Sequence, residues 1–568
     1  MPGTRWRDEE IVENLSSMDP DARLRALRAV KNQIIGNKTK KLSYVKLGAV
    51  PRIVEILATD SSVPLLVQSA AAVGSFACGT EEGVRAVLQS DVLSHMLKIL
   101  SHKDDQVVQA VARSLKLIFN STLAPRANMF EQNALSQLLQ LLFSKNITVA
   151  EVAASVLARC CETPRQQSAI ASAGAIPRLV HLLSLSTPKS QEAALDALAS
   201  LTHSNSEISL ALLDGPVVER ICALLKDRNT RLRVLACSCL ANMSRASSLP
   251  TARQHELAAL ALPVAVRLVG EGEGGFHEAP RVVAQLVSGN ADMQKVACDA
   301  EVVPRLAKLL KKEYDLSPRL LETTLLALAA LTERHEQSRK QLVQAKVLDK
   351  IVQALANNEQ GVRISACKCC LSMSRSVKHL RTALVDSNMT QALLNLLTDG
   401  STEVKEAAAA TLCNMVLDFS PMKEQLLSSG GLRHLAVLAQ APQYVLRLNS
   451  MWALKNLLYL SKSPSKEAVM QSLSYTTMRQ LLLNDVEEVQ TANICGQRWR
   501  WLRVRVREHD KGSCTVQELT SECEGKETRG PQGLHSEFFM YGVQGVMRLN
   551  SWLGIYRTKG HSQTMKWQ

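Results

Sequence analysis

Aromatic residues are scarce in this sequence: they make up 4% of its 568 residues, whereas 46% of the chain is hydrophobic. A core with so few rings must be filled by Leu, Ala and Val, which suits helices packed closely on one another. Long apolar runs are missing as well, and none approaches the ~18 residues that a membrane span requires. Residues 1–18 contain no apolar core of the signal-peptide type. The sequence therefore predicts an intracellular protein, present in the cytoplasm and the nucleus.

Motifs of catalysis and metal binding are also lacking. His335-Glu336 is not followed by the second histidine of a metalloprotease helix, and no Gly-x-Ser-x-Gly elbow occurs. The glycine-rich run at 270–275 has no Lys-Ser/Thr ending, so we interpret it as a surface loop and not as a phosphate site. The 14 cysteines lack the paired spacing of zinc ligands and are expected to be small core residues. We expect no enzyme activity, cofactor, metal ion or small-molecule substrate.

What the chain does have is a repeated unit. The stretch Gly48–Leu57, GAVPRIVEIL, returns almost unchanged as Gly174–Leu183, GAIPRLVHLL, and weaker copies occur elsewhere. The last apolar residues of successive copies lie 41 to 45 positions apart. A period of about 40 to 47 residues without strand signals is typical of a helical armadillo or HEAT solenoid. These last apolar residues are Leu57, Leu100, Leu142, Leu183, Leu225, Val269, Leu310, Leu355, Leu397 and Leu438.

Each unit is predicted to contain a short helix that begins near a proline, such as Pro51 or Pro177, and a longer Ala-rich helix. Neither helix can cover its own apolar face, so each unit must be buried between its neighbours. We therefore predict an all-α, armadillo/HEAT-type solenoid, a right-handed superhelix, with an irregular C-terminal tail. The expected divisions are an N-terminal extension at 1–18, about ten full repeats and a broken one at 19–493, and a tail at 494–568. The longer helices are expected at Val67–Ala77, Gln191–Leu201, Arg231–Met243, Gly361–Met373, Val404–Met415 and Leu446–Leu458.

Repeat solenoids work by presenting a long curved surface, formed mostly by the last helix of each unit. The segment 452–456, Trp-Ala-Leu-Lys-Asn, resembles the Trp-x-x-x-Asn pattern with which importin-alpha binds basic nuclear-localisation peptides. An importin-like adaptor for transport peptides is therefore the alternative function. Ser238 and Ala410 stand where further tryptophans would be needed, and a chain of net charge +14 repels basic peptides. The candidate partner-binding residues are Asn242, Arg245, Ser372, Arg375, Asn414, Trp452 and Asn456.

A closer resemblance covers about residues 19–493. Its segments occur in the order Ile35–Lys38 with Leu47–Arg52, Ser374–Val377 with Leu380–Thr382, Leu412–Asn414 with Phe419–Pro421, and Trp452–Leu454. Together they resemble the armadillo repeat-containing protein 8 family, the solenoid scaffold of the GID/CTLH ubiquitin-ligase complex. The resemblance implies a non-catalytic scaffold that docks onto the ligase core and helps to hold a substrate receptor, whose targets are then degraded. The implied partners are the other subunits of that complex and its receptor.

The end of the chain departs from the family pattern. A further repeat begins near Leu481 but stops near Asn493, and the remaining 75 residues hold 12 basic against 7 acidic side chains and four of the six tryptophans. The alternation at 503–507 is strand-like with one cationic face, which would suit nucleic acid or an anionic membrane. Because the repeat breaks off in its middle, we favour an alternative or aberrant C-terminus that is disordered. We expect this break to expose the apolar face at 481–489 and to weaken receptor binding.

Overall fold

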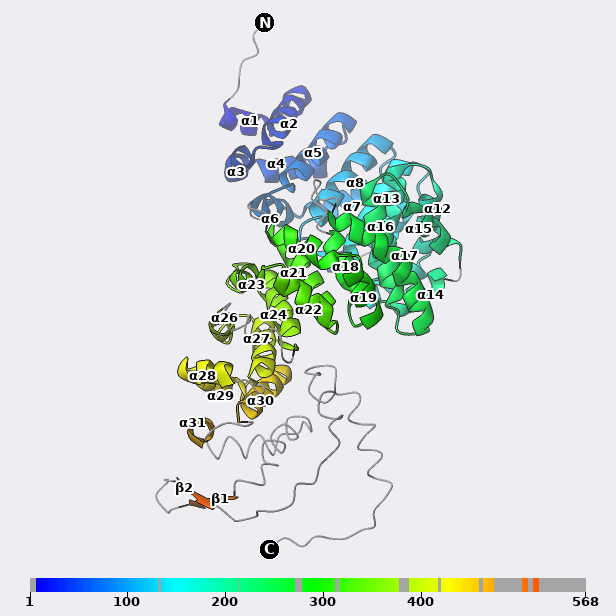
Figure 1. Ribbon diagram of the computed structural model, residues 1–568. Helices are drawn as coiled ribbons and strands as arrows, with labels where there is room; N and C mark the ends of the chain where they lie inside the picture. Colours follow the sequence, from blue (N-terminus) through cyan, green and yellow to red (C-terminus); the bar gives the residue numbers. More distant parts are fainter. Residues whose placement is uncertain are drawn as a thin grey trace, which may run out of the picture. The chain divides into compact units, whose positions relative to one another are not determined.

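The computed structural model describes residues 7–130, 134–213, 215–270, 278–311, 316–376, 388–416, 420–458, 463–473, 503–508 and 514–519. Two strands, β1 (Arg503–Glu508) and β2 (Cys514–Leu519), pair antiparallel with Arg503 opposite Leu519. The other regular elements of these ranges are helices (Figure 1). The predictions about the glycine-rich loop, the broken repeat at 481–493 and most of the tail lie outside the described residues. The strand-like alternation at 503–507 does fall in a strand.

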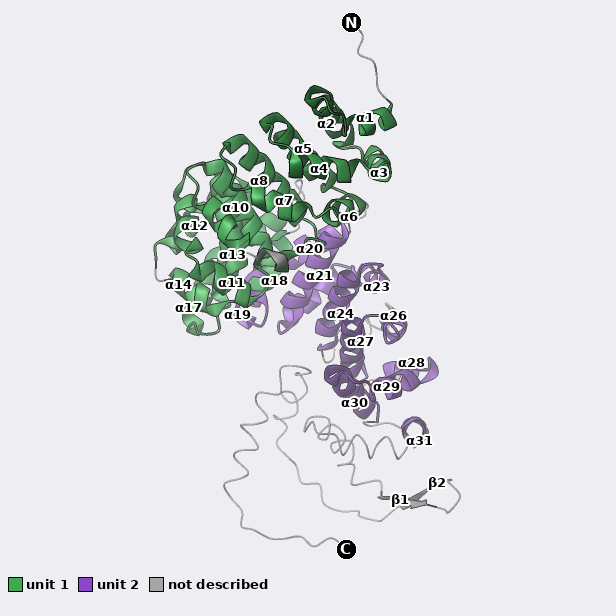
Figure 2. Cartoon of the chain, turned by 180° about the vertical axis from the view of Figure 1, so that it is seen from behind, with its two compact units in different colours: residues 1–286 green, residues 287–568 purple. Residues whose placement is uncertain are grey.

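The chain divides into two compact units, residues 1–286 and 287–568, which Figure 2 distinguishes by colour. In both units the repeating element is a set of three helices. The first is short, the second is short and apolar, and the third is the long Ala-rich helix that the sequence predicts. The predicted all-helical armadillo solenoid is thereby confirmed.

In unit 1, two helices precede the first complete set, and α18 ends at the boundary between the units. The elements are α1 (Asp8–Asn14) and α2 (Pro20–Ile34), followed by α3 (Lys38–Lys46), α4 (Ala49–Thr59) and α5 (Val63–Phe76); α6 (Glu81–Gln89), α7 (Val92–Ile99) and α8 (Asp105–Phe119); η1 (Arg126–Phe130), α9 (Ala134–Leu142) and α10 (Ile147–Cys160); α11 (Pro164–Ser172), α12 (Ala175–Ser184) and α13 (Pro188–Leu201); α14 (Ser206–Leu213), α15 (Val217–Leu224) and α16 (Thr230–Ser244); and α17 (Thr251–Gly270) and α18 (Glu278–Val287).

Unit 2 continues the same order of helices. Its elements are α19 (Ala291–Asp299), α20 (Val302–Leu310) and α21 (Pro318–Thr332); α22 (Glu336–Gln344), α23 (Leu348–Ala354) and α24 (Gln360–Ser374); α26 (Met389–Leu396) and α27 (Thr402–Met415); α28 (Ser420–Ser428), α29 (Gly431–Leu438) and α30 (Tyr444–Leu458); and α31 (Ser463–Ser472).

The corner between the first and second helix of a set depends on one left-handed residue. Gly48 and Gly174 adopt φ of 74° and 83°, a region that glycine enters without the steric cost of a side chain. Each lies three residues before the proline of the repeated motif. Glu301 takes the same conformation before Pro304, with φ of 56°.

The set formed by α17 and α18 lacks this corner. The sequence predicts a short helix at 264–269, but the structure shows one continuous helix of 20 residues with Pro263 inside it. Leu260 occupies the position of Gly48 and Gly174. Leucine enters the left-handed conformation at a steric cost that glycine avoids. Asp91, Glu301 and Asn388 nevertheless adopt it at the same position of their sets, whereas α17 continues through Leu260.

Neighbouring third helices pack closely along each unit. In unit 1, α5 packs between α2 and α8, and in unit 2, α27 packs between α24 and α30. Gly74 shows how close this approach is, because a Cβ there would lie 2.6 Å from Ser114 Oγ. The Ser114 hydroxyl donates to Ala70 O at 2.7 Å and so joins α8 to α5. The core is therefore a continuous layer between successive third helices.

The N-terminal helix α1 packs on this layer as well. Ile11, Val12 and Leu15 are buried, and α1 contacts α2. Lys40 Nζ lies 2.7 Å from Asp8 Oδ2, which ties α3 to α1. Helix α1 thus lies before the boundary predicted at residue 19, yet it packs against α2 and is tied to α3 of the first complete set.

Candidate functional surface

The seven candidate residues differ in how much of each side chain reaches solvent. Asn242, Ser372 and Asn456 are buried, with 6%, 6% and 5% of their surface exposed. The structure places Arg375, Asn414 and Trp452 in half-buried positions, and Arg245 is exposed. All seven lie on third helices or at their ends, but Asn242 and Arg245 belong to unit 1 and the others to unit 2.

The buried asparagines use their amides to join one repeat to the previous one. Asn242 Nδ2 donates to Ala199 O at 2.7 Å, and Asn456 Nδ2 donates to Cys413 O at 2.9 Å. Both bonds span 43 residues, which is one repeat. At least one amide donor of each of these asparagines is therefore engaged inside the solenoid.

The tryptophan of the candidate set is covered by a neighbouring lysine. Lys455 Nζ lies 4.0 Å from the centroid of the Trp452 ring, within the range of a cation–π interaction. An ammonium of the chain itself therefore lies against the ring that a lysine of a basic peptide would contact. The arrangement therefore satisfies the tryptophan within the chain.

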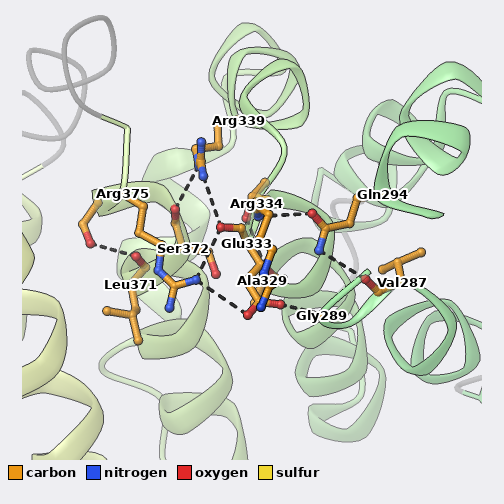
Figure 3. A network of polar contacts seen from close by, with 12 residues as sticks. Val287, Gly289, Gln294, Ala329, Glu333, Arg334, Arg339, Leu371, Ser372 and Arg375 are labelled. Atoms are coloured by element: carbon orange, nitrogen blue, oxygen red, sulfur yellow. Dashed lines mark hydrogen bonds and ion pairs between the residues drawn. The ribbon is translucent and has the colours of Figure 1, made fainter. Parts of the chain in front are cut away.

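Arg375 belongs to a polar network around the end of α21 (Figure 3). Its Nη1 donates to Glu333 O at 3.3 Å and lies 3.7 Å from Glu333 Oε1. Arg339 donates to Glu333 O at 3.1 Å and to Ser372 O at 3.2 Å. Gly289 N donates to Glu333 Oε2 at 3.1 Å. Glu333 thus connects the turn before α19 with the set that contains α22 and α24, and Arg375 is held by this network.

Arg339 is one of several buried polar side chains at the fourth residue of a first helix. Lys41 donates to Cys78 O, Gln167 Nε2 donates to Ser200 O at 3.0 Å, and the Gln294 amide oxygen accepts from Arg334 N at 3.1 Å. Each bond satisfies a backbone group at the end of a third helix, where the helix leaves its polar groups unpaired. Burial lowers the pKa of the Lys41 ammonium. The sequence analysis missed this series, although a polar residue recurs at the same position.

The arginine of the repeated Pro-Arg motif has a related structural role. Arg178 of α12 donates from Nε to Leu142 O at 2.9 Å and from Nη2 to Ser144 O at 2.8 Å. These carbonyls end α9, the second helix of the previous set, where a cation is favourable. Arg52 Nη1 donates in the same way to Val12 O of α1 at 2.8 Å. Helix α1 therefore stands where the second helix of a preceding set would lie.

The cysteines lie mainly inside the helix layer. Burial raises the pKa of Cys237, Cys367 and Cys369 to about 12, so these thiols remain protonated at neutral pH. Among the described residues, no group of three His, Cys, Asp or Glu side chains is arranged to hold a metal ion. In the same residues, no helix combines the length and apolar character needed to cross a membrane.

Comparison with known proteins agrees with this architecture. The model of the armadillo/beta-catenin-like repeat family matches residues 163–203 and 378–417. The first of these segments spans α11, α12 and α13 of unit 1, and the second contains α26 and α27 of unit 2. The matches therefore coincide with sets of helices in both units.

The relatives cover between 38% and 83% of the chain. Armadillo repeat-containing protein 8 of Mus musculus is 28% identical over 497 residues, which cover 83% of this chain and 74% of that protein. GID complex subunit 5 of Schizosaccharomyces pombe is 32% identical, covering 43% of this chain and 34% of its own. Importin subunit alpha-6 of Arabidopsis thaliana is 23% identical, covering 38% of this chain and 40% of its own. The predicted resemblance is thus confirmed: the chain contains armadillo-type repeats and is similar to armadillo repeat-containing protein 8 over most of its length.

Proposed function

We propose that this chain is a non-catalytic scaffold of a GID/CTLH type of ubiquitin-ligase complex. The observation that carries the proposal is the similarity to armadillo repeat-containing protein 8 over 83% of the chain. The similarity to a protein named as a GID complex subunit supports it independently. In this role the solenoid links the ligase core to a substrate receptor, and other subunits supply the chemistry of ubiquitin transfer.

The described side chains suit a scaffold because several polar groups of the third helices join neighbouring sets of the solenoid. Arg159 Nη2 lies 3.1 Å from Asp196 Oδ2 of the next set, as Asn242 and Asn456 likewise bridge neighbouring sets. Such bonds fix the spacing of the repeats, and a rigid surface loses little entropy when a partner binds. Binding energy then comes from shape and from exposed residues such as Arg245.

The proposal is tested by purifying the tagged chain from cells and quantifying its partners by mass spectrometry. We expect the subunits of the ligase core to be recovered in fixed proportion, in both cytoplasmic and nuclear fractions. A second bait that ends at Asn493 should recover the same core, because the repeats lie before that residue. Recovery of no ligase subunit by either bait, while both show helical circular dichroism spectra, would overturn the proposal.

Receptor binding is a separate outcome of the same experiment. Residues 494–568 contain no recognisable copy of the repeated motif, so we expect this chain to recover the substrate receptor in substoichiometric amount. Receptor recovery equal to that of the core subunits would contradict this expectation and leave the scaffold role intact.

The importin-like alternative makes a different prediction at the tryptophan. It requires a basic peptide to displace Lys455 from the Trp452 ring and to compete for the Asn456 amide. We expect no saturable binding of a Lys/Arg-rich peptide at physiological salt. Tight binding that is lost in Trp452→Ala and retained in Lys455→Ala would favour the adaptor function.

A further inference from the structure

The exposed face of α2, α5 and α8 carries an imbalance of charge. These three helices pack side by side in unit 1 (Figure 2). Their only acidic residues are Asp21 and Asp105, each in the first turn of its helix, and α5 holds no charged residue at all. Helices α2 and α8 hold six basic residues. These are Arg23, Arg25, Arg28, Lys31, Arg113 and Lys116.

One of these cations is aligned with the tryptophan of the importin-like pattern. Arg23 of α2 and Arg447 of α30 each donate from Nη1 to the carbonyl oxygen six residues earlier, both at 2.9 Å. The two arginines therefore occupy the same position of a third helix. Five residues further on stand Arg28 in α2 and Trp452 in α30.

A second arginine occupies the same position in α8. Ser114 of α8 and Thr411 of α27 each donate to a carbonyl 44 residues earlier, in the preceding third helix. The residues before them, Arg113 and Ala410, are thus equivalent, and Ala410 stands in the tryptophan position. One repeat before Arg113, the same position of α5 is held by Ala71. The two arginines at this position therefore lie on either side of a small residue.

Four of the six basic residues keep their charge available for a partner. Arg23 and Arg25 form ion pairs with acidic residues, whereas the other four form none within the described part of the chain. Among these four, Arg28, Arg113 and Lys116 are exposed. The acidic residues of the helices stand seven and eight positions before residues 28 and 113, roughly 10–12 Å along the helix axis.

The surface between the two arginines is small and neutral. Ala71 and Ser75 of α5 are half-buried, and neither carries a charge. Gln68 of α5 accepts from Lys31 Nζ at 2.8 Å, a bond to a neutral group that leaves the ammonium charge unopposed. Asn32 of α2 is exposed, and its amide can bond to a backbone that crosses the face. The face therefore combines cations at both sides with a low middle and a free amide.

We propose that this face binds an extended acidic segment of a partner protein. Neighbouring packed helices lie about 8–10 Å apart, so Arg28 and Arg113 are separated by roughly 16–20 Å. An extended chain rises about 3.3 Å per residue, and five or six residues therefore span that distance. Carboxylates at both ends of such a segment pair with the guanidinium groups, and its middle crosses Ala71. The inference adds a class of partner to the scaffold role and does not depend on the ligase assignment.

A protein segment fits the face better than a nucleic acid or a membrane does. Single-stranded nucleic acids stack their bases on exposed aromatic rings. The only aromatic residues of α2, α5 and α8 are Phe76 and Phe119, and both are fully buried. Membrane-surface binding requires large apolar side chains to insert, and none of the exposed large apolar residues of the described chain lies within these helices.

Fluorescence anisotropy with the full chain tests the proposal. The probe is a labelled 12-residue peptide with three glutamates at each end of a six-residue Gly/Ser segment. The control peptide has glutamine in place of every glutamate. We expect saturable binding of the glutamate peptide at physiological salt and at least about tenfold weaker binding of the glutamine peptide.

The decisive comparison is between two charge reversals of equal size. Arg28→Glu/Arg113→Glu reverses the two arginines of the face. The matched control, Arg220→Glu/Lys226→Glu, reverses two exposed cations at the second helix α15 of the same unit and changes the net charge equally. We expect the affinity for the glutamate peptide to fall at least about tenfold in the first variant and to stay within about twofold in the second. Circular dichroism melting establishes that both variants keep the fold.

Three results would overturn the proposal. The first is no saturable binding of the glutamate peptide. The second is an equal loss of affinity in the two variants, which would mean that only the net charge of the chain matters. The third is tighter binding of a 12-nucleotide oligo-dT, or of vesicles containing phosphatidylserine, that is lost in Arg28→Glu/Arg113→Glu, because the face would then serve another class of partner.

Discussion

Replacement of Arg178 by methionine tests whether the Pro-Arg motif serves the spacing between repeats. Methionine keeps an unbranched apolar stem and removes the guanidinium. The guanidinium makes two hydrogen bonds, to Leu142 O at 2.9 Å and to Ser144 O at 2.8 Å. Both acceptors lie at the C-terminal end of α9, one set earlier in the chain. The substitution therefore disconnects α12 from α9 and leaves the rest of α12 in place.

The magnitude follows from these two bonds. Hydrogen bonds to a charged group contribute about 1.5–3 kcal/mol each when well shielded. Arg178 is half-buried, so water partly replaces the lost bonds, and we expect a net cost of about 2 kcal/mol. If the lost free energy affects only the end of α9, the population of its open form rises about 30-fold, because each 1.4 kcal/mol or so changes an equilibrium constant tenfold.

Amide hydrogen exchange measures this opening directly. The amides of Phe143 and Ser144 bond to Leu139 O and Leu141 O, so their exchange reports on the end of α9. We expect about 30-fold faster exchange there in Arg178→Met and unchanged exchange in α24. The matched control Arg433→Met removes an exposed arginine from another second helix. Exchange at 143–144 within about threefold of the unmodified chain would refute the assigned role of the arginine.

Three further substitutions and conditions test other parts of the structure. Asn242→Ala removes a buried hydrogen bond between repeats and should lower the free energy of unfolding by about 1–3 kcal/mol. The control Asn414→Ala, at a half-buried position, should change it by less than about 0.5 kcal/mol. Denaturant titration compares the two variants, and equal effects would contradict the distinction between them. Gly48→Ala should lower the free energy of unfolding by about 1–2 kcal/mol, because Gly48 has a φ of 74° that alanine adopts only with strain, although its Cβ would meet no atom within 4 Å. The control Gly400→Ala is at an equally open position without positive φ and should melt at the same temperature as the unmodified chain. Burial raises the pKa of Cys369 to about 12 from an ordinary 9.0, so the folded chain retains a proton that the unfolded chain loses between these values. The free energy of unfolding should therefore fall as the pH rises above 9, by up to about 1.4 kcal/mol per pH unit for this thiol. Urea titrations at several pH values should show a smaller decline for Cys369→Ala than for the unmodified chain.

The repeat pattern and the third helices could be predicted because each depends on local sequence. Apolar spacing, proline at helix starts and Ala-rich runs act within one set, and all six predicted long helices occur in the structure. The continuous helix α17 was missed. Leu260 stands in the motif position that holds glycine at 48 and 174, but other sets turn with Asp91, Glu301 or Asn388 there, so the residue at this position alone does not predict whether the chain turns.

The candidate surface was harder to predict for a physical reason. A helical position shows which side of its own set a residue occupies, but the bond partners of Asn242 and Asn456 are carbonyls 43 residues earlier. Whether an amide faces solvent or a neighbouring set depends on how the sets stack. The carbonyl bond of Asn456 and the proximity of Lys455 to Trp452 appear only once that stacking is known, and the role of the seven residues in partner binding stays a prediction.

The interrepeat bonds join residues about one repeat apart, which has a consequence for how the protein is made. Arg159 and Asp196 are 37 residues apart, Ser114 and Ala70 are 44 apart, and Asn456 and Cys413 are 43 apart. Each such contact can form as soon as one further repeat has left the ribosome. Synthesis at about 5–20 residues per second supplies a new repeat every few seconds, far more slowly than a helix forms. The order of translation can therefore become the order of folding, with each finished set providing the template for the next.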